Sequence, residues 1–424
     1  MTLGQEITVG PFHFPVLRLL IAVGLIRIAV RGEGLPASSR GLDRWMFAWA
    51  TWAIVSSLFR EDVPASLVNR LGLVFNGLGT YVLFRVFCRS TADLINVGRI
   101  IAWLLVPLML EMMSERQTGR NLFAAFGSVG ELPEVRGGVL RAQGPFAHPI
   151  LAGSVGAACL PLMAGIWRTH RLSAIVGASA CLLIVYASAS SGPILSAVCA
   201  CVALAAWPLR KHMRVVRWSV VGVYALLELV MNAPAYYLLA RIDMTGSSTS
   251  WHRAELINTA ITHLSEWWLI GTDVTRHWMS YGVGWSSNHI DITNYYINMG
   301  VYGGLLLMLL FIAVMAKGFS LVGDETSQSV DSPDQPGSRF TMWALGAALF
   351  THAATFVSIS YFDQSVVFLY LTLAAIGGAR GVAKADRTRS TLPTALGYRA
   401  RSEQQRLAKP GTGRGFNEET GRLF

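Results

Sequence analysis

The sequence has little charge for its length. Only 14% of its 424 residues are charged, whereas 53% are hydrophobic and the mean hydropathy is +0.44. An average soluble domain carries about 25% charged residues. This chain has too few charged groups to cover a water-facing surface of its size, so the composition excludes a large soluble protein.

Other absences narrow the class further. The five cysteines have no histidine at metal-ligand spacing and no arrangement that indicates an extracellular disulfide, so we expect packing roles for them. The N-terminus lacks a basic stretch followed by a small-residue cleavage site, so we expect no cleavable signal peptide. We find no internal repeat and no stretch that predicts a soluble domain. The net charge of +10 does not indicate a nucleic-acid partner, because the arginines cluster beside apolar runs, where they set the orientation in a membrane.

Long apolar runs fill most of the chain, and about 20 apolar residues cross a bilayer as a helix. The runs lie near 11–30, 42–59, 70–88, 93–112, 146–167, 171–188, 193–208, 216–234, 295–316, 341–361 and 363–379. The first is the least regular, because it contains Arg18 and Arg27. The predicted fold is all-α: a polytopic bundle of about eleven transmembrane helices, with a large loop on the outer face that carries short amphipathic helices.

Basic residues gather in alternate connections between these runs, and such connections face the cytoplasm. They include Arg31, Arg40, Arg44, Arg85, Arg89, Arg168, Arg171, Arg210, Lys211, Arg214, Arg217 and Lys317. The long connections 113–145 and 235–294 then face outward, and so does the N-terminus. An outward N-terminus is less usual, and it raises the alternative that a first helix is absent.

Two segments read as unstructured and cytoplasmic. Residues 322–339 are polar and rich in helix breakers, which is typical of a linker. Residues 381–424 form a basic tail that anionic lipid head groups would attract. We therefore predict a transmembrane domain at 1–380, with outer loops 113–145 and 235–294, followed by this tail.

The first outer loop ends at two proline corners, Gly144-Pro145 and His148-Pro149. Each proline pushes the residue before it away from the α region, so the pair directs the loop into the next helix. Arg141 lies just before them, at the level of the head groups. It is either an interfacial side chain whose charge reaches the head groups or an anion contact. His148 is either a helix-start residue or a substrate contact.

The second outer loop contains a predicted amphipathic helix over 251–266, capped by one of Ser247–Ser250. Its apolar face is predicted at Trp251, Ala254, Ile257, Ile261 and Leu264, with Arg253 away from it. A cation near a helix N-terminus is unfavourable unless an anion is bound, so Arg253 either binds an anion or lies at a frayed end. Trp267, Trp268, Trp278 and Trp285 either anchor the loop at the interface or stack on sugars.

The end of this loop predicts a helix that is capped by Asn288 and begins at His289. Asp291 would then occupy the third helical position, where a carboxylate completes a capping box. Positions two apart on a helix differ by about 200°, so His289 and Asp291 would point different ways. The helix N-terminus favours neutral imidazole, which suits His289 to act as a general base. Glycines at 300, 303 and 304 would let the helix pack closely.

Four separated motifs together resemble the O-antigen ligase and polysaccharide polymerase family of bacterial inner-membrane glycosyltransferases. They are Arg141-Ala-Gln-Gly-Pro-Phe-Ala-His-Pro149, the turn Ser190-Ser191-Gly192, Ser250-Trp251-His252-Arg253 followed by Trp268-Leu269-Ile270-Gly271, and His289-Ile290-Asp291 ahead of Gly300. The resemblance covers roughly residues 40–380. Each motif is weak alone, and their order and spacing carry the resemblance.

The resemblance implies an inner-membrane enzyme with its site facing the periplasm and an undecaprenyl-diphosphate-linked glycan as donor. It implies that Arg141 and Arg253 bind the donor diphosphate and that His289 activates an acceptor hydroxyl on a glycan or lipid, with Asp291 as the second catalytic candidate. Further substrate contacts are expected at His148, Arg241, His252, Trp268 and Asn294. The resemblance implies neither a cofactor nor a metal, and neither outer loop has the Asp-x-Asp pair of metal-bound nucleotide-sugar enzymes.

Two departures from the family pattern matter. Many members have an arginine in the serine-rich turn, where this chain has Gly192-Pro193, so a third cation on the diphosphate is in doubt. The family's asparagine after the histidine is Ile290 here, so Asp291 or Asn294 would take its polar role. Ligation and polymerisation differ mainly in the acceptor, which these motifs do not distinguish.

The alternative class is a transporter or a flippase for lipid-linked oligosaccharides. Such proteins usually contain internal repeats and helices broken at the membrane midplane. The sequence predicts neither feature and gathers its polar residues in outer loops instead. A non-catalytic assembly component is a further alternative, and it predicts that the polar loop residues are replaceable.

Overall fold

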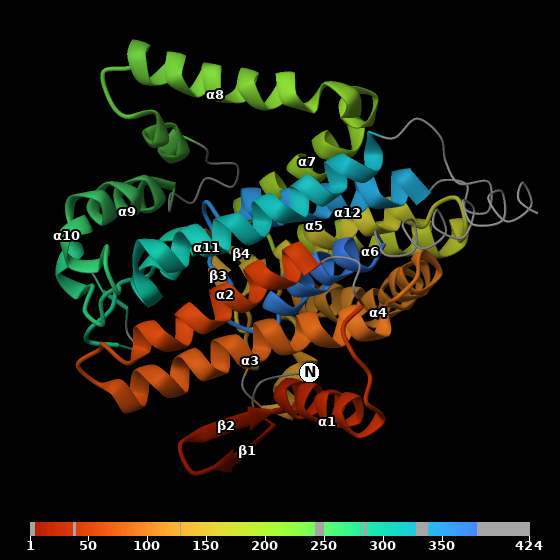
Figure 1. The fold of residues 1–424 in the computed structure, drawn as a ribbon, viewed down its shortest axis with the longest axis horizontal. Coiled ribbons are helices and arrows are strands. Elements are labelled where there is room, and N and C mark those ends of the chain that lie inside the picture. The colour runs from red at the N-terminus through yellow and green to blue at the C-terminus, as the bar shows by residue number, and fades with distance from the viewer. Residues whose placement is uncertain are drawn as a thin grey trace, which may run out of the picture.

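The computed structural model describes residues 5–36, 40–127, 129–241, 250–280, 282–283, 286–327 and 338–379. The predicted tail, most of the predicted linker, Trp285 and the cap candidates Ser247–Thr249 lie outside this part of the chain. The described residues are mostly helical (Figure 1). The predicted linker starts too early, because α11 continues to Thr326.

The elements alternate long helices with short surface pieces. In the first half they are β1 (Glu6–Val9), β2 (Phe12–Pro15), α1 (Val16–Arg31), α2 (Arg40–Ser57), α3 (Val63–Phe87), α4 (Thr91–Thr118), η2 (Leu122–Phe126), β3 (Glu134–Arg136), β4 (Val139–Arg141), α5 (Pro149–Gly165) and α6 (Arg171–Ala187). In the second half they are α7 (Ser191–Ala205), η3 (Trp207–His212), α8 (Met213–Val230), η4 (Ala235–Arg241), α9 (Ser250–Thr262), α10 (Leu264–Trp267), η5 (Arg276–Trp278), α11 (Tyr295–Thr326), α12 (Ser338–Thr355) and a final helix, Val366–Ala379.

The prediction of about eleven membrane spans is wrong in number. Within the described residues, three helices are long and apolar enough to cross a membrane: α3, α4 and α11. The bent pair of α7 with η3 and α8, which turns by 73°, makes a fourth if it is one span. Most of the other predicted runs form helices of 18 residues or fewer, and 17 residues rise only about 26 Å against a hydrocarbon core of about 30 Å.

The bundle has a buried centre and an apolar outside. Every residue of α5 from Leu151 to Met163 is buried, because α6, α7 and α12 pack around it. By contrast, α8 has no buried residue and stands off the other helices in Figure 1. Large apolar side chains are also exposed along α1, α4 and α6. Such a surface suits lipid better than water.

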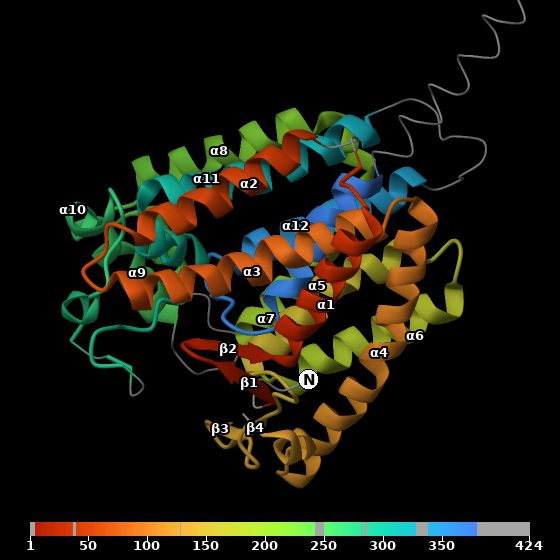
Figure 2. The same cartoon turned by 60° about the horizontal axis from the view of Figure 1, so that its bottom comes forward.

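Two small antiparallel hairpins depart from the all-α prediction. The first, β1 with β2, lies beside the start of α1 in Figure 2. The second, β3 with β4, belongs to the first outer loop and is also seen in Figure 2. Neither is part of a larger sheet, so the described fold remains a helix bundle.

Helix α11 is broken one-third of the way along, contrary to the expectation of unbroken helices. Gly303 and Gly304 have non-helical backbone angles, and the φ of Gly304 is 76°. A Cβ at Gly304 would lie 2.3 Å from the Leu269 carbonyl oxygen, so only glycine fits this close approach. The third glycine, Gly300, packs as predicted, because a Cβ there would lie 2.3 Å from the Trp267 ring.

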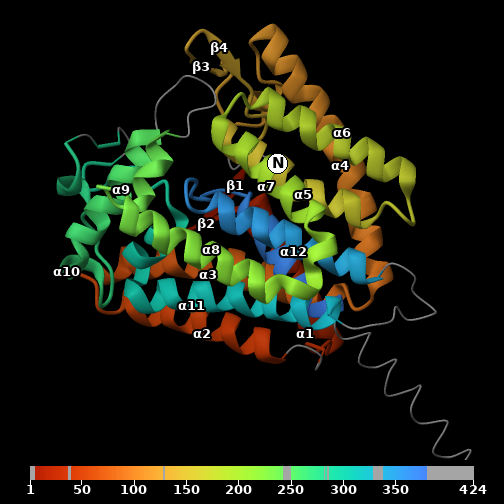
Figure 3. The ribbon, with the colours of Figure 1, turned by 90° about the horizontal axis from the view of Figure 1, so that it is seen from above.

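The sequence predicts that the end of α2, the start of α5, the start of α11 and the end of α12 lie on one side of a membrane. In the structure these helix ends contact one another in pairs. The end of α2 meets the broken part of α11, and the loops before α5 and after α12 are hydrogen-bonded to each other. Figures 1 and 3 show α2, α3 and α11 running side by side toward the end of the molecule where α9 and α10 lie. We call this the loop end.

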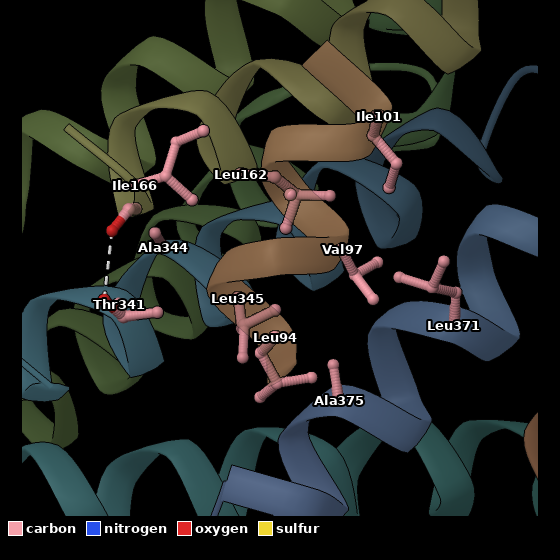
Figure 4. A pocket seen from close by; sticks show the side chains of 12 residues that line it. Leu94, Val97, Ile101, Leu162, Ile166, Thr341, Ala344, Leu345, Leu371 and Ala375 are labelled. Carbon is pink, nitrogen blue, oxygen red and sulfur yellow. Dashed lines mark hydrogen bonds between the residues drawn. The ribbon is translucent and has the colours of Figure 1, made fainter. Parts of the chain in front are cut away.

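The opposite end of the helices holds a small apolar cleft. It is lined by the first turns of α4 and α12, the last turn of α5 and the final helix (Figure 4). Its polar contact is the bond that Thr341 Oγ1 donates to the Gly165 carbonyl, at 3.0 Å. The cleft lies at the far end of α5 from His148, so it is separate from the polar residues of the loop end.

Candidate functional site

The β3–β4 hairpin positions Arg141 at the loop end. Gly137 and Gly138 form its two-residue turn with φ of 56° and 76°, the geometry of a type I′ turn. The register sets Glu134 opposite Arg141, so the two are a cross-strand pair. Sequence reasoning missed Glu134, although the Gly-Gly pair between two short alternating stretches is a hairpin signal.

The guanidinium of Arg141 is buried and bound to side chains. Nη1 donates to Glu134 Oε1 at 2.7 Å, and Nη2 donates to Ser190 Oγ at 2.6 Å. Nε has no hydrogen-bond partner among the described residues. Arg141 is therefore not an interfacial side chain that extends to water; it crosses from the first outer loop to the serine-rich turn.

His148 is the N-cap of α5, which confirms its helix-start role. The Ile150 amide donates to its Nδ1 at 3.1 Å, so the proton is on Nε2, which lies 3.3 Å from Glu134 Oε2. Burial lowers the pKa of His148, and the nearby charges of Glu134 and Asp291 oppose this effect. With both nitrogens engaged, neutral His148 is poorly suited to accept a proton.

The segment from Arg141 to His148 is held by polar side chains that sequence reasoning missed. Glu115 accepts hydrogen bonds from the amides of Gln143 and Gly144. On the other side, Asp363 accepts from the Ala147 amide at 3.0 Å, and Gln364 Nε2 donates to the Pro145 carbonyl at 2.7 Å. These bonds occupy the backbone of the loop and so fix the positions of Arg141 and His148.

The serine-rich turn between α6 and α7 lies between the two predicted arginines. Ser190 accepts from Arg141 and donates to the Ser188 carbonyl at 2.7 Å. Ala189 has a φ of 42°, which is unfavourable for a residue with a Cβ. A Cβ built on Gly192 would lie 3.9 Å from Arg253 Nη2. We call Arg141, Arg253 and residues 188–192 the arginine turn.

The predicted apolar face of the amphipathic helix is wrong for most of its members. Trp251 and Ile261 are more than half exposed, whereas Arg253, Leu256 and Ala260 are buried. The buried positions recur at spacings of three and four, so this face of α9 packs on the bundle. Arg253 belongs to this buried face, so its side chain points toward Gly192 in the serine-rich turn and away from solvent.

The predicted helix at His289 does not form. Helix α11 begins at Tyr295, and its N-cap is Asn294, whose side chain accepts from the amides of Tyr296 and Ile297. Residues 289–294 have no regular structure. His289 and Asp291 therefore do not lie on a helix, and the predicted angle of about 200° between them does not hold. The helix begins six residues later than predicted, because Asn294 satisfies two amides of the buried helix start.

His289 and Asp291 lie in this segment with different neighbours. Burial lowers the pKa of His289; Asp273 raises it and Arg70 lowers it further. Asp291 is exposed, and its charge acts to raise the pKa of His148. The backbone carbonyl of Asp291 accepts a hydrogen bond from His252 Nε2 at 2.9 Å. The sequence prediction that His289 is neutral thus agrees in direction, although burial is the main cause and no helix N-terminus is involved.

A second arginine pair, which sequence reasoning missed, binds the break in α11. Arg60 Nη2 donates to the carbonyls of Val301 and Tyr302, at 2.6 and 3.1 Å. Arg70 Nε donates to the Tyr302 carbonyl at 3.0 Å, and its guanidinium lies 3.9 Å from the Tyr302 ring centre. Arg60 also pairs with Asp273 at 3.3 Å. We call Arg60 and Arg70 the helix-break arginines.

The remaining candidates separate into buried and exposed groups. Trp267 and Trp278 are buried in a small apolar cluster with Ile290 and Val301, so these two pack and do not stack on sugars. Trp268 is half exposed. Arg241 is exposed at the end of η4, and Asn294 donates from its side chain to the Val357 carbonyl at 3.0 Å.

One group in the described residues has the composition of a metal site: His263, Glu266 and His277. It belongs to α10 and η5 and shares no residue with the arginine turn. Comparison with protein-family models and with curated proteins finds no match to this chain.

Proposed function

We propose that the loop end transfers or polymerises an undecaprenyl-diphosphate-linked glycan onto an acceptor hydroxyl, at the periplasmic face of a bacterial inner membrane. The observation that carries this proposal is the meeting of Arg141 and Arg253 at one turn, although they come from different loops. Two buried guanidiniums around one turn suit a diphosphate, which two planar cations can bind through paired hydrogen bonds.

The contacts of Arg141 suit reversible binding of an anion. Glu134, one of its two side-chain partners, is partly exposed, and Nε has no partner among the described residues. A phosphate oxygen can replace the carboxylate at Nη1, and Ser190 holds the guanidinium meanwhile. The exposed charges of other loop residues are screened by water, so the two buried arginines would supply most of the affinity.

The reaction needs no metal in this proposal. The acceptor hydroxyl attacks the anomeric carbon, the bond from that carbon to the diphosphate oxygen breaks, and undecaprenyl diphosphate leaves with the bonding electrons. Arg141 and Arg253 stabilise the charge that develops on this leaving group. His289 takes the hydroxyl proton, because burial keeps its imidazole neutral. Asp291 is the alternative base.

The proposal covers both ligation, as in lipopolysaccharide assembly, and polymerisation, as for an exopolysaccharide. In either case the donor arrives through the bilayer, so its lipid would lie against the apolar outer surface of the helices. Trp268, Arg241 and His252 remain the proposed contacts for the sugars of donor and acceptor.

A transporter or flippase is the second candidate, and the break in α11 favours it, since broken helices often bind substrates in transporters. The carbonyls freed at Val301, Tyr302 and Gly303 accept hydrogen bonds from Arg60, Arg70 and Trp52, however. These groups are satisfied within the protein and do not line a substrate cavity, so the break supports transport only weakly.

Purified protein in detergent, given a defined lipid-linked oligosaccharide and an acceptor glycan, tests the proposal. We expect glycan transfer without added Mg²⁺ or Mn²⁺, and loss of transfer in Arg141→Ala. The matched control is Arg136→Ala, an arginine of the same hairpin outside the arginine turn. In proteoliposomes, movement of a labelled donor across the bilayer without transfer would support the flippase instead. Normal glycan assembly in the Arg141→Ala and Arg253→Ala strains would contradict both the site and its role.

A further inference from the structure

Two histidines bind one carboxylate on the surface of the loop end. His263 Nδ1 lies 2.7 Å from Glu266 Oε1, and His277 Nε2 lies 2.8 Å from Glu266 Oε2. One potential ligand atom from each residue lies within 4.8 Å of the others. All three side chains are partly exposed, so an ion in solution can reach them.

The local fold holds these side chains in position. His263 and Glu266 lie three residues apart at the start of α10, so they share one face of its single turn. His277 comes from η5. Trp278 is buried, stacks on the His263 ring at 5.7 Å and donates from Nε1 to Glu266 Oε2 at 3.0 Å. A bond of this kind orients a ligating carboxylate.

We propose that His263, Glu266 and His277 form a Zn²⁺ site with a fourth position open to water. Two imidazoles and one carboxylate are ligands that Zn²⁺ and similar transition metals prefer, whereas Mg²⁺ and Ca²⁺ prefer oxygen ligands alone. With metal–ligand bonds of about 2.0–2.2 Å, the ligand atoms separate slightly from their present hydrogen-bond distances. His263 Nδ1 and His277 Nε2 then direct lone pairs at the ion, and their protons lie on the opposite ring nitrogens.

The site would stabilise the second outer loop. It joins α10 to η5, and the tryptophans beside its ligands, Trp267 and Trp278, pack in the apolar cluster against Ile290. An ion here would therefore cross-link the segment that leads to His289 and Asp291. Its ligands are separate from the arginine turn, so the proposal stands independently of the transfer reaction.

Titration of the full chain with Co²⁺ as the probe, after removal of metals and without a histidine tag, tests this site. We expect one equivalent to bind with micromolar affinity or better, with visible absorption bands typical of nitrogen and oxygen ligands, and Zn²⁺ to displace it. His263→Ala, Glu266→Gln and His277→Ala should each weaken binding roughly tenfold or more, by analogy with outer-shell changes that cost 10–100-fold. His212→Ala, an exposed histidine on η3, is the matched control.

The Tm without metal separates binding from folding. Each variant should unfold near the temperature of the parent chain, and only the parent and His212→Ala should gain stability from Zn²⁺. If one variant fails to fold, Co²⁺ binding is measured in His277→Asn instead. His277 is the most exposed ligand, so this substitution should disturb folding least. Absence of saturable Co²⁺ binding to the parent, or equal binding by all variants and the control, would overturn the proposal.

Discussion

Two pairs of buried arginines lie at the loop end, and they differ in what their guanidiniums bind. The helix-break arginines, Arg60 and Arg70, donate to backbone carbonyls of α11. At the arginine turn, Arg141 donates to the side chains of Glu134 and Ser190. The carbonyls at the helix break are fixed by the backbone and share donors, since the Tyr302 carbonyl accepts from both arginines and the Val301 carbonyl accepts from the Thr272 amide as well. A carboxylate or a hydroxyl can instead turn toward water.

The difference separates a structural role from a binding role. Removing Arg60 or Arg70 removes buried hydrogen bonds to the Val301 and Tyr302 carbonyls, which costs folding free energy even though each carbonyl keeps another donor. Removing Arg141 leaves Glu134 partly exposed and Ser190 still bonded to Ser188. Burial alone therefore does not indicate that an arginine binds a ligand. A better indication is that its partners are side chains that a ligand can replace.

The largest effect is expected from substitution of His289. Arg70, one of the helix-break arginines, contributes to lowering the pKa of His289, and the neighbouring Asp291 acts to raise the pKa of His148. His289→Ala should bind donor and lose about a hundredfold or more in transfer rate, the usual contribution of a general base. Because its pKa is lowered by burial, the base stays neutral at neutral pH, and the rate of the parent enzyme should fall only at pH values below the ordinary pKa of histidine. A pH profile of kcat/KM measures this fall.

Asp291→Asn is the control for this assignment. It should lose less activity than His289→Ala and keep the inflection in the pH profile. A folded, inactive Asp291→Asn beside a His289→Ala of normal rate would show that Asp291 is the base.

The arginine turn should give the next effect. A charge-assisted hydrogen bond contributes about 1.5–3 kcal/mol, so Arg141→Ala and Arg253→Ala should each reduce transfer tenfold or more while the Tm changes little. Lysine at either position should restore only part of the activity, because it cannot form two parallel bonds. Donor binding by the purified variants measures the effect, and a large loss of Tm with normal donor affinity would make these residues structural.

The helix-break arginines should show the reverse pattern. Arg60→Ala removes one donor from each of the buried carbonyls of Val301 and Tyr302, which keep the Thr272 amide and Arg70, and it breaks the ion pair with Asp273. Hydrogen bonds to a charged group contribute about 1.5–3 kcal/mol, so a measurable loss of stability follows. We expect a lower Tm and poor yield, with donor affinity retained in the folded fraction. Arg70→Lys keeps the charge but loses the Nε–H and the flat contact with Tyr302, so a smaller loss of Tm is expected. A stable Arg60→Ala with no donor binding would remove the distinction between the two pairs.

The smallest effect is expected from Glu134→Gln. Glu134 is 38% exposed, so its ion pair with Arg141 contributes less than about 1 kcal/mol after screening by water. In the proposed function it competes with phosphate for Arg141, so the variant should bind donor up to about fivefold more tightly. Binding of a lipid diphosphate at low salt measures this shift, and weaker binding would mean that Glu134 positions Arg141 for the donor.

Several features were predictable because they depend on local patterns. His148 begins a helix, since two prolines direct the chain there, and α9 and α10 cover the predicted helix at 251–266. The composition indicated apolar helices long enough to cross a membrane, but it did not give their number. Apolar runs predict helices, and only the length of each helix between its real ends decides whether it can cross a bilayer.

The sequence indicated two arginines and the serine-rich turn that the structure brings together, and it did not indicate the other contacts of these arginines. Motif spacing indicated Arg141 and Arg253, but the predicted helix at His289 and the exposed face for Arg253 were wrong. Each of these errors came from a local rule that tertiary contacts override: Asn294 caps the helix, and Arg253 packs with Leu256 and Ala260.

The sequence by itself determined that this chain is helical, apolar on its surface and polar at a few loops, because hydropathy and turn residues act over short distances. Only the tertiary structure decided which buried charges belong together. Glu134 faces Arg141 through a hairpin register, and Arg60 meets the carbonyls of α11 from a distant loop. Such pairings depend on contacts between residues far apart in the chain, and a hydrogen bond at 3 Å leaves no trace in the spacing of either partner.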